Sequence, residues 1–383
     1  MTAPGPRVST RPGMVAASIA AVDVYPVTVP RRGVYALQRG NSAVDSWFAL
    51  VRVTADDGTY GWGECVTRVK SMHHIATDHL RGRLIGHDVC DIEGYHRVVD
   101  EEEMLAIERL WHWNPIRAAI EMALFDIQGK LLRVSLGDLL GGARRTRIPT
   151  VKNIGIGSPE SAADIARRYT DEGYTLVKAR VGGDPAVDEA RLAAIRDAIP
   201  DDVRIRIDAN QAWSWKEALR LIGRYSAYGL EAVEQPCDFW DVSSNARVTA
   251  ESPVPIISDE GFVSASEAQL LLTGGGADVL HAYLGKCGGI SPVMAISTLA
   301  SSFGAVLTMG ERVPLGVSEA AHLHVASVLP SLAYPCALAY DLNEDDLLID
   351  SPARSGGHLD VPQGPGLGVD VDLDKVAFYA RKD

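Results

Sequence analysis

Short apolar segments alternate with amphipathic helical segments from about residue 148 to about residue 350. This pattern is typical of repeated βα units, in which helices connect parallel strands. Seven or eight such units in about 200 residues predict an α/β fold of the (β/α)8 barrel type rather than an open doubly wound sheet. The expected strands are Thr150–Ile154, Leu176–Ala179, Val203–Ile207, Ala232–Glu234, Ile256–Ser258, Val279–Tyr283, Val306–Thr308 and a poorly marked eighth near Ala337–Tyr340.

The chain before the barrel has a different pattern. Residues 19–29, 47–54 and 60–64 alternate apolar and polar side chains as strands do, and Asp56-Asp57-Gly58 supplies a turn, so we expect an antiparallel meander. A helix with apolar residues spaced by three and four is expected over 116–132. This region is therefore predicted to be an α+β unit beside the barrel.

Four parts of the chain are expected from these patterns. The first residues carry no continuous apolar run and are expected to be a disordered tail. The last residues are expected to leave the barrel and pack back on the α+β unit. The parts are the tail, 1–16; an α+β capping domain, 17–143; the barrel, 144–359; and the C-terminal segment, 360–383.

Three successive apolar segments end in an acidic residue: VRIRID ends at Asp208, LEAVE at Glu234 and PIISD at Asp259. The intervals are 26 and 25 residues, each close to one βα unit. Because the carboxyl ends of barrel strands form one rim, the three carboxylates are expected to converge there. Such an all-oxygen ligand set suits Mg2+, or Mn2+, and lacks the soft ligands that zinc prefers.

Each of these acids has a simpler explanation when it is taken alone. An acidic residue at the end of a strand is often a helix N-cap or the partner of a buried cation. Their common spacing favours a metal site over that explanation, but the residues alone leave both open.

The residues around these acids resemble the three metal-ligand signatures of the enolase superfamily. The signatures are Asp208-Ala-Asn210, Glu234-Gln-Pro236 and Ser258-Asp259-Glu260. The resemblance implies a capped barrel that removes the proton beside a substrate carboxylate with the help of a divalent metal, although a fold alone does not select a reaction. It covers residues 19 to about 375 through the further motifs Gly61-Trp-Gly-Glu64, Ala123-Leu-Phe-Asp126, Leu139-Leu-Gly-Gly142 and Pro365-Gly-Leu-Gly368.

Within that superfamily the chain is most similar to the mandelate racemase and muconate-lactonising groups, and closest to the latter. In these groups a KxK motif on the second barrel strand supplies a base, and a sixth-strand residue faces it across the substrate. Here the second strand reads Lys178-Ala-Arg180, and Tyr283 stands where the sixth strand would carry lysine or aspartate. Neither usual base is present.

Other roles are therefore expected for the residues at these positions. Arg180 hardly deprotonates, so it is expected to clamp a carboxylate or a developing enediolate. Lys178 can act as the base if a metal and a guanidinium push it toward neutrality. Tyr283 can act on the opposite face if Lys286 lowers its pKa. Glu311 resembles a seventh-strand glutamate of the muconate-lactonising group, which polarises substrate or accepts a hydrogen bond.

Some candidates depend on strand register. For Lys178 and Arg180 a function is favoured, because two cations beside an acidic cluster are costly unless they are used, and simple ion pairs with the acids are the alternative. For Lys152 and Lys286 a packing or solvent position is the favoured alternative. The candidates for substrate binding are Lys152, Asn210, Glu260 and Arg312.

Three histidines are expected in the core or at an interface rather than in catalysis. His281 precedes Tyr283 by two residues and should lie deeper in the barrel, and His322 and His324 fall in the helical run SEAAHLHVASVL.

Composition narrows the classes of partner and compartment. A formal charge of −13 without a basic cluster argues against nucleic acid and anionic membranes. Five scattered cysteines predict neither a disulfide framework nor a zinc site and fit a reducing cytoplasm. No apolar stretch approaches the ~20 residues that span a bilayer. A homo-oligomer is expected, as for many soluble enzymes.

The expected activity is abstraction of the α-proton of a small-molecule carboxylate by an isomerase of the cycloisomerase or racemase/epimerase type. Racemisation needs competent groups on both faces of the substrate, whereas cycloisomerisation or dehydration can use one. An acid-sugar or hydroxy-acid dehydratase is therefore the alternative, and a metal- and carboxylate-binding protein without turnover is a third. Substrate choice is expected to depend on loops near Arg31–Arg39 and Cys65–Lys70.

Overall fold

The computed structural model describes residues 17–32, 45–67, 71–105, 113–338 and 342–380. The expected tail over 1–16 lies outside these ranges, as do residues 33–39 and 68–70 of the two loops expected to set specificity.

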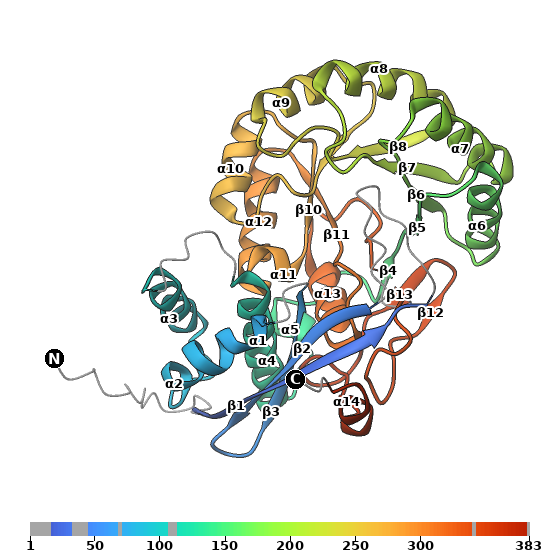
Figure 1. The fold of residues 1–383 in the computed structure, drawn as a ribbon. Helices are drawn as coiled ribbons and strands as arrows, with labels where there is room; N and C mark the ends of the chain where they lie inside the picture. Colours follow the sequence, from blue (N-terminus) through green and yellow to red (C-terminus); the bar gives the residue numbers. More distant parts are fainter. Residues whose placement is uncertain (1–16, 33–44, 68–70, 106–112, 339–341, 381–383) are drawn as a thin grey trace.

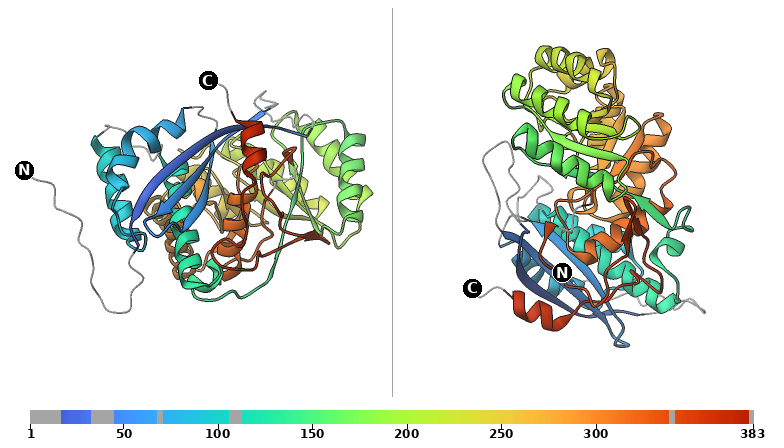
Figure 2. Two further views of the ribbon diagram at one scale, coloured as in Figure 1. Left: turned by 90° about the horizontal axis from the view of Figure 1, so that it is seen from below. Right: turned by 90° about the vertical axis from the view of Figure 1, so that its right-hand side faces the viewer.

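Seven parallel strands form a curved sheet in the order β5-β6-β7-β8-β9-β10-β11, and Figures 1 and 2 show helices along its outer side. This arrangement confirms the predicted α/β barrel class. The predicted strands match the observed ones to within a few residues. The strands are β5 (Lys152–Ile154), β6 (Leu176–Arg180), β7 (Arg204–Asp208), β8 (Leu230–Glu234), β9 (Ile256–Ser258), β10 (Val279–Ala282) and β11 (Val306–Met309).

Several of the helices after these strands begin at a capping side chain. Ser158, Asp184, Ser214 and Ser264 each accept a hydrogen bond from a backbone N–H two or three residues further on. Such caps satisfy donors that have no partner inside the helix, and they fix where each loop leaves the barrel rim. The helices are α6 (Pro159–Asp171), α7 (Pro185–Ala198), α8 (Trp215–Tyr225), η2 (Ser226–Tyr228), α9 (Val242–Glu251), α10 (Ala265–Thr273), α11 (Leu284–Cys287), α12 (Ile290–Ser302) and α13 (Gly316–Val328).

The eighth barrel segment connects the two edges of the sheet without forming a regular strand. Cys336 bridges Thr150 beside β5, and Ala337 bridges Gly310 beside β11. Pro335 precedes these bridges and has no N–H to donate, which limits regular pairing. The barrel thus closes where the eighth strand was predicted, although residues 339 and 340 lie outside the described ranges.

The capping domain is built on an antiparallel sheet in the predicted order β1-β2-β3, which packs against α4. Gly61 and Gly63 make this contact possible, because a Cβ on either would overlap the backbone carbonyl of Ala123 or Ala119 in α4. The glycines therefore serve close packing. The elements are β1 (Ile19–Pro30), β2 (Asp45–Ala55), β3 (Tyr60–Thr67), α1 (Met72–His74), η1 (Ile75–Leu80), α2 (Arg81–Leu84), α3 (Ile92–Leu105), α4 (Asn114–Leu132) and α5 (Leu136–Leu139).

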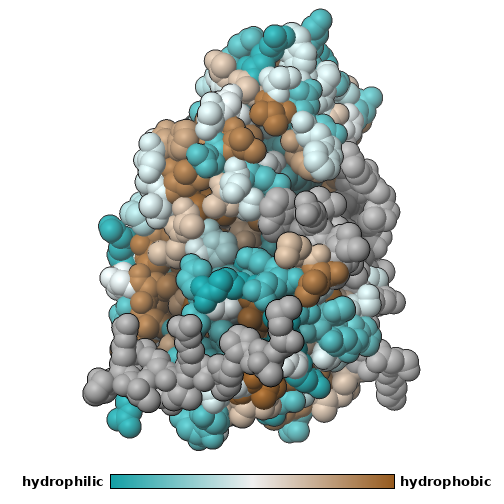
Figure 3. Space-filling model, turned by 90° about the vertical axis from the view of Figure 1, so that its left-hand side faces the viewer, coloured by the Kyte–Doolittle hydropathy of each residue, from teal (hydrophilic) through white to brown (hydrophobic). Residues whose placement is uncertain are grey.

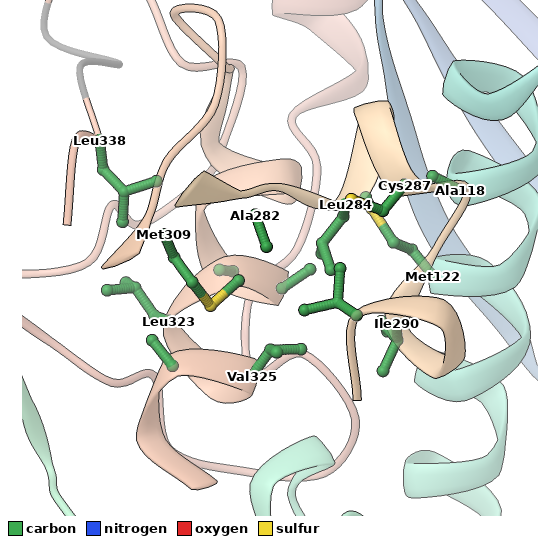
Figure 4. Close-up of a cluster of buried hydrophobic side chains, with 14 of the residues drawn as sticks. Ala118, Met122, Ala282, Leu284, Cys287, Ile290, Met309, Leu323, Val325 and Leu338 are labelled. Atoms are coloured by element: carbon green, nitrogen blue, oxygen red, sulfur yellow. The ribbon is translucent and has the colours of Figure 1, made fainter. Parts of the chain in front are cut away.

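One apolar cluster joins the two domains. Figure 4 shows Met122 of α4 and Leu323 of α13 in the same cluster as Leu284 and Met309, which come from the barrel. Every residue of α13 is buried, including the polar side chains of Glu319, His322 and His324. The barrel rim is thus held against the capping domain by a continuous core.

The C-terminal segment returns to both domains. Strand β13 (His358–Asp360) pairs with β12 (Arg354–Ser355) on one side and with β4 (Arg147–Pro149) on the other, and α14 (Leu373–Tyr379) packs against β1. Leu367 donates its N–H to Asp126 of α4 at 2.8 Å, which fastens this segment to the capping domain.

The outer surface mixes polar and apolar side chains. Figure 3 shows apolar patches between hydrophilic ones on one side of the molecule. Leu270 on α10 and Phe303 at the end of α12 are 70% and 45% exposed. None of the helices within the described ranges is both long enough and apolar enough to span a membrane.

Candidate active site

The acidic residues predicted from the sequence lie at the ends of three neighbouring strands. Asp208 is the last residue of β7, Glu234 is the last of β8, and the two pair across the sheet. Asp259 directly follows β9. The side chains of Asp208 and Glu234 are 1% and 0% exposed, and that of Asp259 is 16% exposed. Three carboxylates therefore approach one buried centre.

The backbone turns sharply after two of these acids. Asn210, Gln211 and Gln235 have positive φ angles of 43°, 67° and 37°. Such conformations cost about 1–3 kcal/mol and persist where neighbouring contacts hold them. Here Gln211 donates its N–H to the carbonyl of Gln235 at 2.8 Å, and the side chain of Gln235 accepts the N–H of Asp259 at 2.9 Å. These contacts tie the three strand ends together.

Lys178 on β6 lies between two of the carboxylates. Its Nζ is 2.5 Å from Oε1 of Glu234 and 2.9 Å from Oδ2 of Asp208, and its side chain is 4% exposed. Burial disfavours the charged form of Lys178, but Asp208 and Glu234 outweigh this effect and raise its pKa above the ordinary value. The two acids therefore favour the charged form of Lys178 in this arrangement.

Arg180 lies nearer the rim on the same strand. Its Nη1 is 2.6 Å from Oδ2 of Asp208 and also donates to Oδ1 of Asn210, and its side chain is 15% exposed. Both cations of β6 thus make the ion pairs weighed as their alternative role. Because Arg180 is partly exposed, its guanidinium can still reach a bound anion.

These contacts affect the two neighbouring carboxylates differently. Burial raises the pKa of Asp208, although Arg180 and Lys178 oppose the shift. Burial would also raise the pKa of Glu234, but Lys178 and His281 hold it well below its ordinary range. Glu234, which makes the shortest contact with Lys178, is the acid most firmly held in its charged form.

Lys286 lies in this buried centre rather than in solvent. Its Nζ is 3.1 Å from Oδ1 of Asp259 and 2.6 Å from the carbonyl oxygen of His281, and it also donates to the carbonyl of Asp259. The ammonium lies 4.6 Å from the ring centroid of Tyr283. Lys286 therefore holds Asp259 much as Lys178 holds Glu234.

Tyr283 forms the wall next to Lys286. Its side chain is buried, and its hydroxyl is hydrogen-bonded to Arg312, which is exposed at the rim. Burial raises the pKa of Tyr283 well above 10, Asp259 adds to the shift and Arg312 opposes it. The expectation that Lys286 lowers this pKa is therefore wrong, and the hydroxyl keeps its proton.

Two further acids at the rim have a pKa near neutrality. Oε1 of Glu260 accepts a hydrogen bond from Asn210 at 3.3 Å, Oε2 has no hydrogen-bond donor, and burial raises the pKa of Glu260 to about 7. Burial also raises the pKa of Glu311 to about 7, although the backbone N–H groups of Arg312 and Gly285 donate to it. Asn210 thus links Arg180 to Glu260, while Glu311 contacts Gly285 and Arg312 contacts Tyr283.

Lys152 does not join this group. In the pairing of β5 with β6 it lies opposite Val177, whereas Asn153 lies opposite Lys178. Side chains alternate between the two faces of a strand, so Lys152 points to the helix-covered face. There its Nζ lies 5.8 Å from the ring centroid of Tyr169. The prediction that Lys152 binds substrate is therefore wrong, because the strand register turns it away from the centre.

His281 is the residue whose position the sequence reasoning missed. It is buried, as expected, but its Nδ1 lies 3.4 Å from Oε1 of Glu234 and 3.8 Å from Oδ1 of Asp259. Leu280 pairs with Ser258, which brings His281 level with Asp259. The two-residue spacing from Tyr283, which directly follows β10 in extended conformation, was the available signal, since it places both side chains on the same side of the sheet.

The other two histidines lie within α13, as predicted. His322 donates from Nδ1 to the carbonyl of Ser318 at 2.7 Å and accepts the N–H of Leu284 at Nε2 at 3.1 Å. Burial lowers the pKa of His322 to about 4. His324 is buried and accepts the N–H of Gly137 at Nδ1. Both rings are neutral packing elements.

The centre fits a divalent cation. Glu234, Asp259 and His281 each offer one ligand atom, and these atoms all lie within 4.8 Å of one another. Oε2 of Glu234 is buried without a hydrogen-bond donor, a position that is costly unless a cation takes it. Asp208 is not in this group and is held beside it by Lys178 and Arg180.

Two models of known protein families match the chain, one over each of its two domains. Residues 20–141 match the family model of the mandelate racemase / muconate lactonizing enzyme N-terminal domain, and residues 161–376 match the enolase C-terminal domain-like model. The chain belongs to the mandelate racemase/muconate lactonizing enzyme family of the enolase superfamily.

Members of this family resemble the chain over nearly its whole length. N-succinyl-L-Arg/Lys racemase of Bacillus cereus is 28% identical over 370 residues, which cover 93% of this chain and 96% of that protein. A chloromuconate cycloisomerase of Pseudomonas sp. is 33% identical over 328 residues, covering 84% and 85%. The crystal structure of 2-chloromuconate cycloisomerase from Rhodococcus opacus 1CP has a TM-score of 0.88 at 26% identity, covering 95% of this chain and all of that one. The chain is thus an enolase-superfamily enzyme whose relatives are isomerases.

Proposed function

We propose that this enzyme isomerises a small-molecule carboxylate by moving the proton on the carbon next to the carboxylate group, with a divalent cation as cofactor. The observation that carries the proposal is the convergence of Asp208, Glu234 and Asp259 on one buried centre with cations on both sides of it. Three carboxylates alone would favour Mg2+ or Mn2+. A bound divalent ion supplies positive charge that makes the α-proton of a carboxylate more acidic.

The net charge of the side chains at the centre is balanced by one divalent ion together with one substrate carboxylate. Asp208, Glu234, Asp259 and Glu260 carry four negative charges when ionised, and Lys178, Arg180 and Lys286 carry three positive charges. A divalent ion changes the excess from one negative to one positive charge, and a substrate carboxylate balances it. We propose that Arg180, at the partly exposed edge, holds that carboxylate.

The side chains from β6 and the side chain of Tyr283 are proposed to act on opposite faces of the substrate. Lys178 and Arg180 come from β6, and Tyr283 follows β10, with three strands between them in the sheet. Tyr283 retains its proton and is hydrogen-bonded to Arg312, so it is suited to donate a proton to an enediolate. Lys178 is the proposed acceptor of the α-proton on the other face. It could accept this proton once a bound substrate and cofactor weaken its contacts with Asp208 and Glu234, which stabilise its charged form.

A screen for exchange of the α-proton with solvent tests the proposal before any product is known. The protein would be incubated in D2O with a carboxylate library, and deuterium at the α-carbon would be measured by mass spectrometry. The names of the relatives suggest including N-succinyl amino acids, dipeptides and chloromuconates. Exchange that EDTA abolishes and Mg2+ or Mn2+ restores is expected. No exchange with any of them, together with tight carboxylate binding, would overturn the proposal.

Two alternatives are each favoured by one observation. Glu311, whose pKa is raised to about 7 by burial, is an acid that could protonate a departing hydroxyl, as a dehydratase requires. The replacement of both usual lysine bases by Arg180 and Tyr283 favours a protein that binds metal and carboxylate without turnover. Loss of water from exchanged hydroxy acids would identify the first alternative, and binding without exchange the second.

A further inference from the structure

The backbone is strained shortly after the end of β11. Val313 has a φ angle of 48°, and within the described ranges it is the one β-branched residue with a positive φ. A branched side chain is crowded against the backbone in this conformation, so the conformation persists only where neighbouring contacts hold it. Strain of this kind gathers at active sites, where function rather than stability fixes the backbone.

The strained residue closes a tight turn that carries two side chains of the rim. The N–H of Val313 donates to the carbonyl of Glu311 at 3.0 Å, so Arg312 is the central residue of the turn. Arg312 is hydrogen-bonded to the hydroxyl of Tyr283, and Glu311 accepts the N–H of Gly285 at 3.3 Å. The conformation of Val313 therefore sets where Arg312 meets Tyr283.

The side chain of Asn343 holds this turn. Its Nδ2 donates to the carbonyl of Val313 at 3.3 Å and to the carbonyl of Pro314 at 2.9 Å. Asn343 is 2% exposed, and its Oδ1 has no hydrogen-bond donor in the part of the chain that the structure describes. The two N–H groups of one amide thus fix two successive carbonyls, which keeps Val313 in its strained conformation.

The backbone around Asn343 is anchored to the capping domain. The N–H of Glu344 donates to the carbonyl of Pro30 at 2.9 Å, and the N–H of Arg32 donates to the carbonyl of Leu342 at 2.8 Å. Pro30 is the last residue of β1. These pairings on either side of Asn343 make its side chain a fixed support for the turn.

We propose that Asn343 is a positioning residue for proton transfer: it holds the strained turn at Val313 so that Arg312 meets the hydroxyl of Tyr283. The inference rests on the proposed function, since Tyr283 is the proposed proton donor. Asn343 contacts the turn from a buried position and touches none of the groups proposed to bind substrate. Its loss should therefore slow proton transfer more than it weakens substrate binding.

The test compares Asn343→Ala with a matched loss of hydrogen bonds elsewhere. Asn245→Ala is the control, because Asn245 is also buried and also donates to two backbone carbonyls, those of Asp238 and Asp241. The full-length protein would be labelled with 13C at the tyrosine Cζ atoms, whose NMR resonances respond to hydrogen bonding of the hydroxyl. The Tyr283 resonance is the one that is missing from Tyr283→Phe. We expect Asn343→Ala to shift this resonance and Asn245→Ala to leave it in place.

Relief of the strain should reverse the effect. Glycine adopts a positive φ freely, so Val313→Gly added to Asn343→Ala should return the Tyr283 resonance to its wild-type position. A resonance that Asn343→Ala does not shift, or that Val313→Gly does not return, would overturn the inference. If Asn343→Ala does not fold, the double variant decides. A folded double variant with the wild-type resonance supports the inference, and a double variant that also fails to fold overturns it.

Exchange of the α-proton gives the kinetic effect and separates this inference from the proposed function. With a carboxylate that exchanges, Asn343→Ala should lower kcat by about tenfold to 100-fold and change KM by less than about threefold, since a small misplacement of a reacting group has effects of this size. An unchanged kcat would overturn the inference and leave the proposed function standing. If no carboxylate exchanges in the wild-type protein, the proposed function fails, while a Tyr283 resonance that shifts and returns still supports the hold of Asn343 on Arg312 and Tyr283.

Discussion

Two sets of buried carboxylates in this protein are held in opposite ways. The strand-end set, Asp208, Glu234 and Asp259, contacts the side-chain cations of Lys178, Arg180 and Lys286. The interface set, Glu64 and Glu121, comes from the capping domain and accepts backbone N–H groups of the barrel. The first set lies at the open end of the barrel, and the second lies between the domains.

The interface set caps two barrel helices. Glu64 accepts the N–H of Leu315 at 2.7 Å and of Ser318 at 2.8 Å, at the start of α13. Glu121 accepts the N–H groups of Ile290 and Ser291 at the start of α12. Carboxylates at helix N-termini satisfy free donors and interact favourably with the helix dipole. The motif containing Glu64 therefore has a structural explanation in this fold.

The difference shows how a buried acid can be kept for function or for structure. A side-chain cation can move aside when a metal or substrate arrives, so the strand-end set can exchange its partners. Backbone donors in a helix cannot leave, so the interface set is fixed. Substitutions in the two sets should consequently affect different measurements.

The largest effect is expected from Glu234→Gln. This change removes one negative charge with almost no change in volume, and it should lower metal-dependent α-proton exchange at least about 1000-fold, or about 4 kcal/mol. Glu231→Gln is the matched control, because Glu231 lies on the same strand and pairs with Arg206. Deuterium incorporation measured side by side should be near wild type for Glu231→Gln. Equal rates in the two variants would show that the strand-end set has no special role.

Lys178→Met should mainly affect stability. It leaves Asp208 and Glu234 buried without the ammonium between them, and loss of one partner of a buried ion pair costs about 3–5 kcal/mol. Urea unfolding should show this loss in the absence of divalent ions. Added Mg2+ or Mn2+ should recover part of it, since the ion supplies charge to the same carboxylates. A loss that no ion reduces would contradict a shared site.

Glu64→Gln should have a smaller effect that depends on pH. Burial raises the pKa of Glu64 from 4.5 to about 8, although Ser318 and Leu315 donate to it. Because the folded pKa lies above the unfolded value, the protonated acid contributes stability below about pH 4.5 that is lost as the pH rises through about 8. The variant should be less stable than wild type at pH 5 by about 1–2 kcal/mol, through a weakened hydrogen bond. Thermal unfolding should show this gap closing by pH 9, whereas a gap of the same size at pH 5 and pH 9 would mean that Glu64 is already charged at pH 5.

Lys152→Met should have the smallest effect. Lys152 is buried like Lys178, but burial lowers its pKa to about 8, and the nearby Arg354 adds to the shift. Methionine relieves the cost of burying the charge and loses the cation–π contact with Tyr169, so the free energy of unfolding should change by less than about 1 kcal/mol. Exchange activity should stay within about twofold of wild type. A large loss of exchange would contradict this prediction and show that Lys152 takes part in the active site.

Much of the fold and part of the site could be predicted because the signals are local. Apolar runs followed by amphipathic helices indicate βα units, and acids that end successive runs must meet at one rim in a barrel, whatever the loops do. Asp208, Glu234 and Asp259 were found in this way. The eighth strand was poorly marked, and Pro335 gives a reason for its irregular pairing.

Tertiary structure decided which face each remaining side chain occupies and what charge it carries. A shift of one residue in register turns a side chain from the centre to the helices, and this separates Lys152 from Lys178. The pKa values of Lys178 and Tyr283 depend on partners from other strands, which no local pattern specifies. His281 meets Glu234 and Asp259 only because three strands and the glycine at 310 bring them together. The sequence by itself thus determined the barrel and its ring of acids, and packing between distant segments determined what surrounds them.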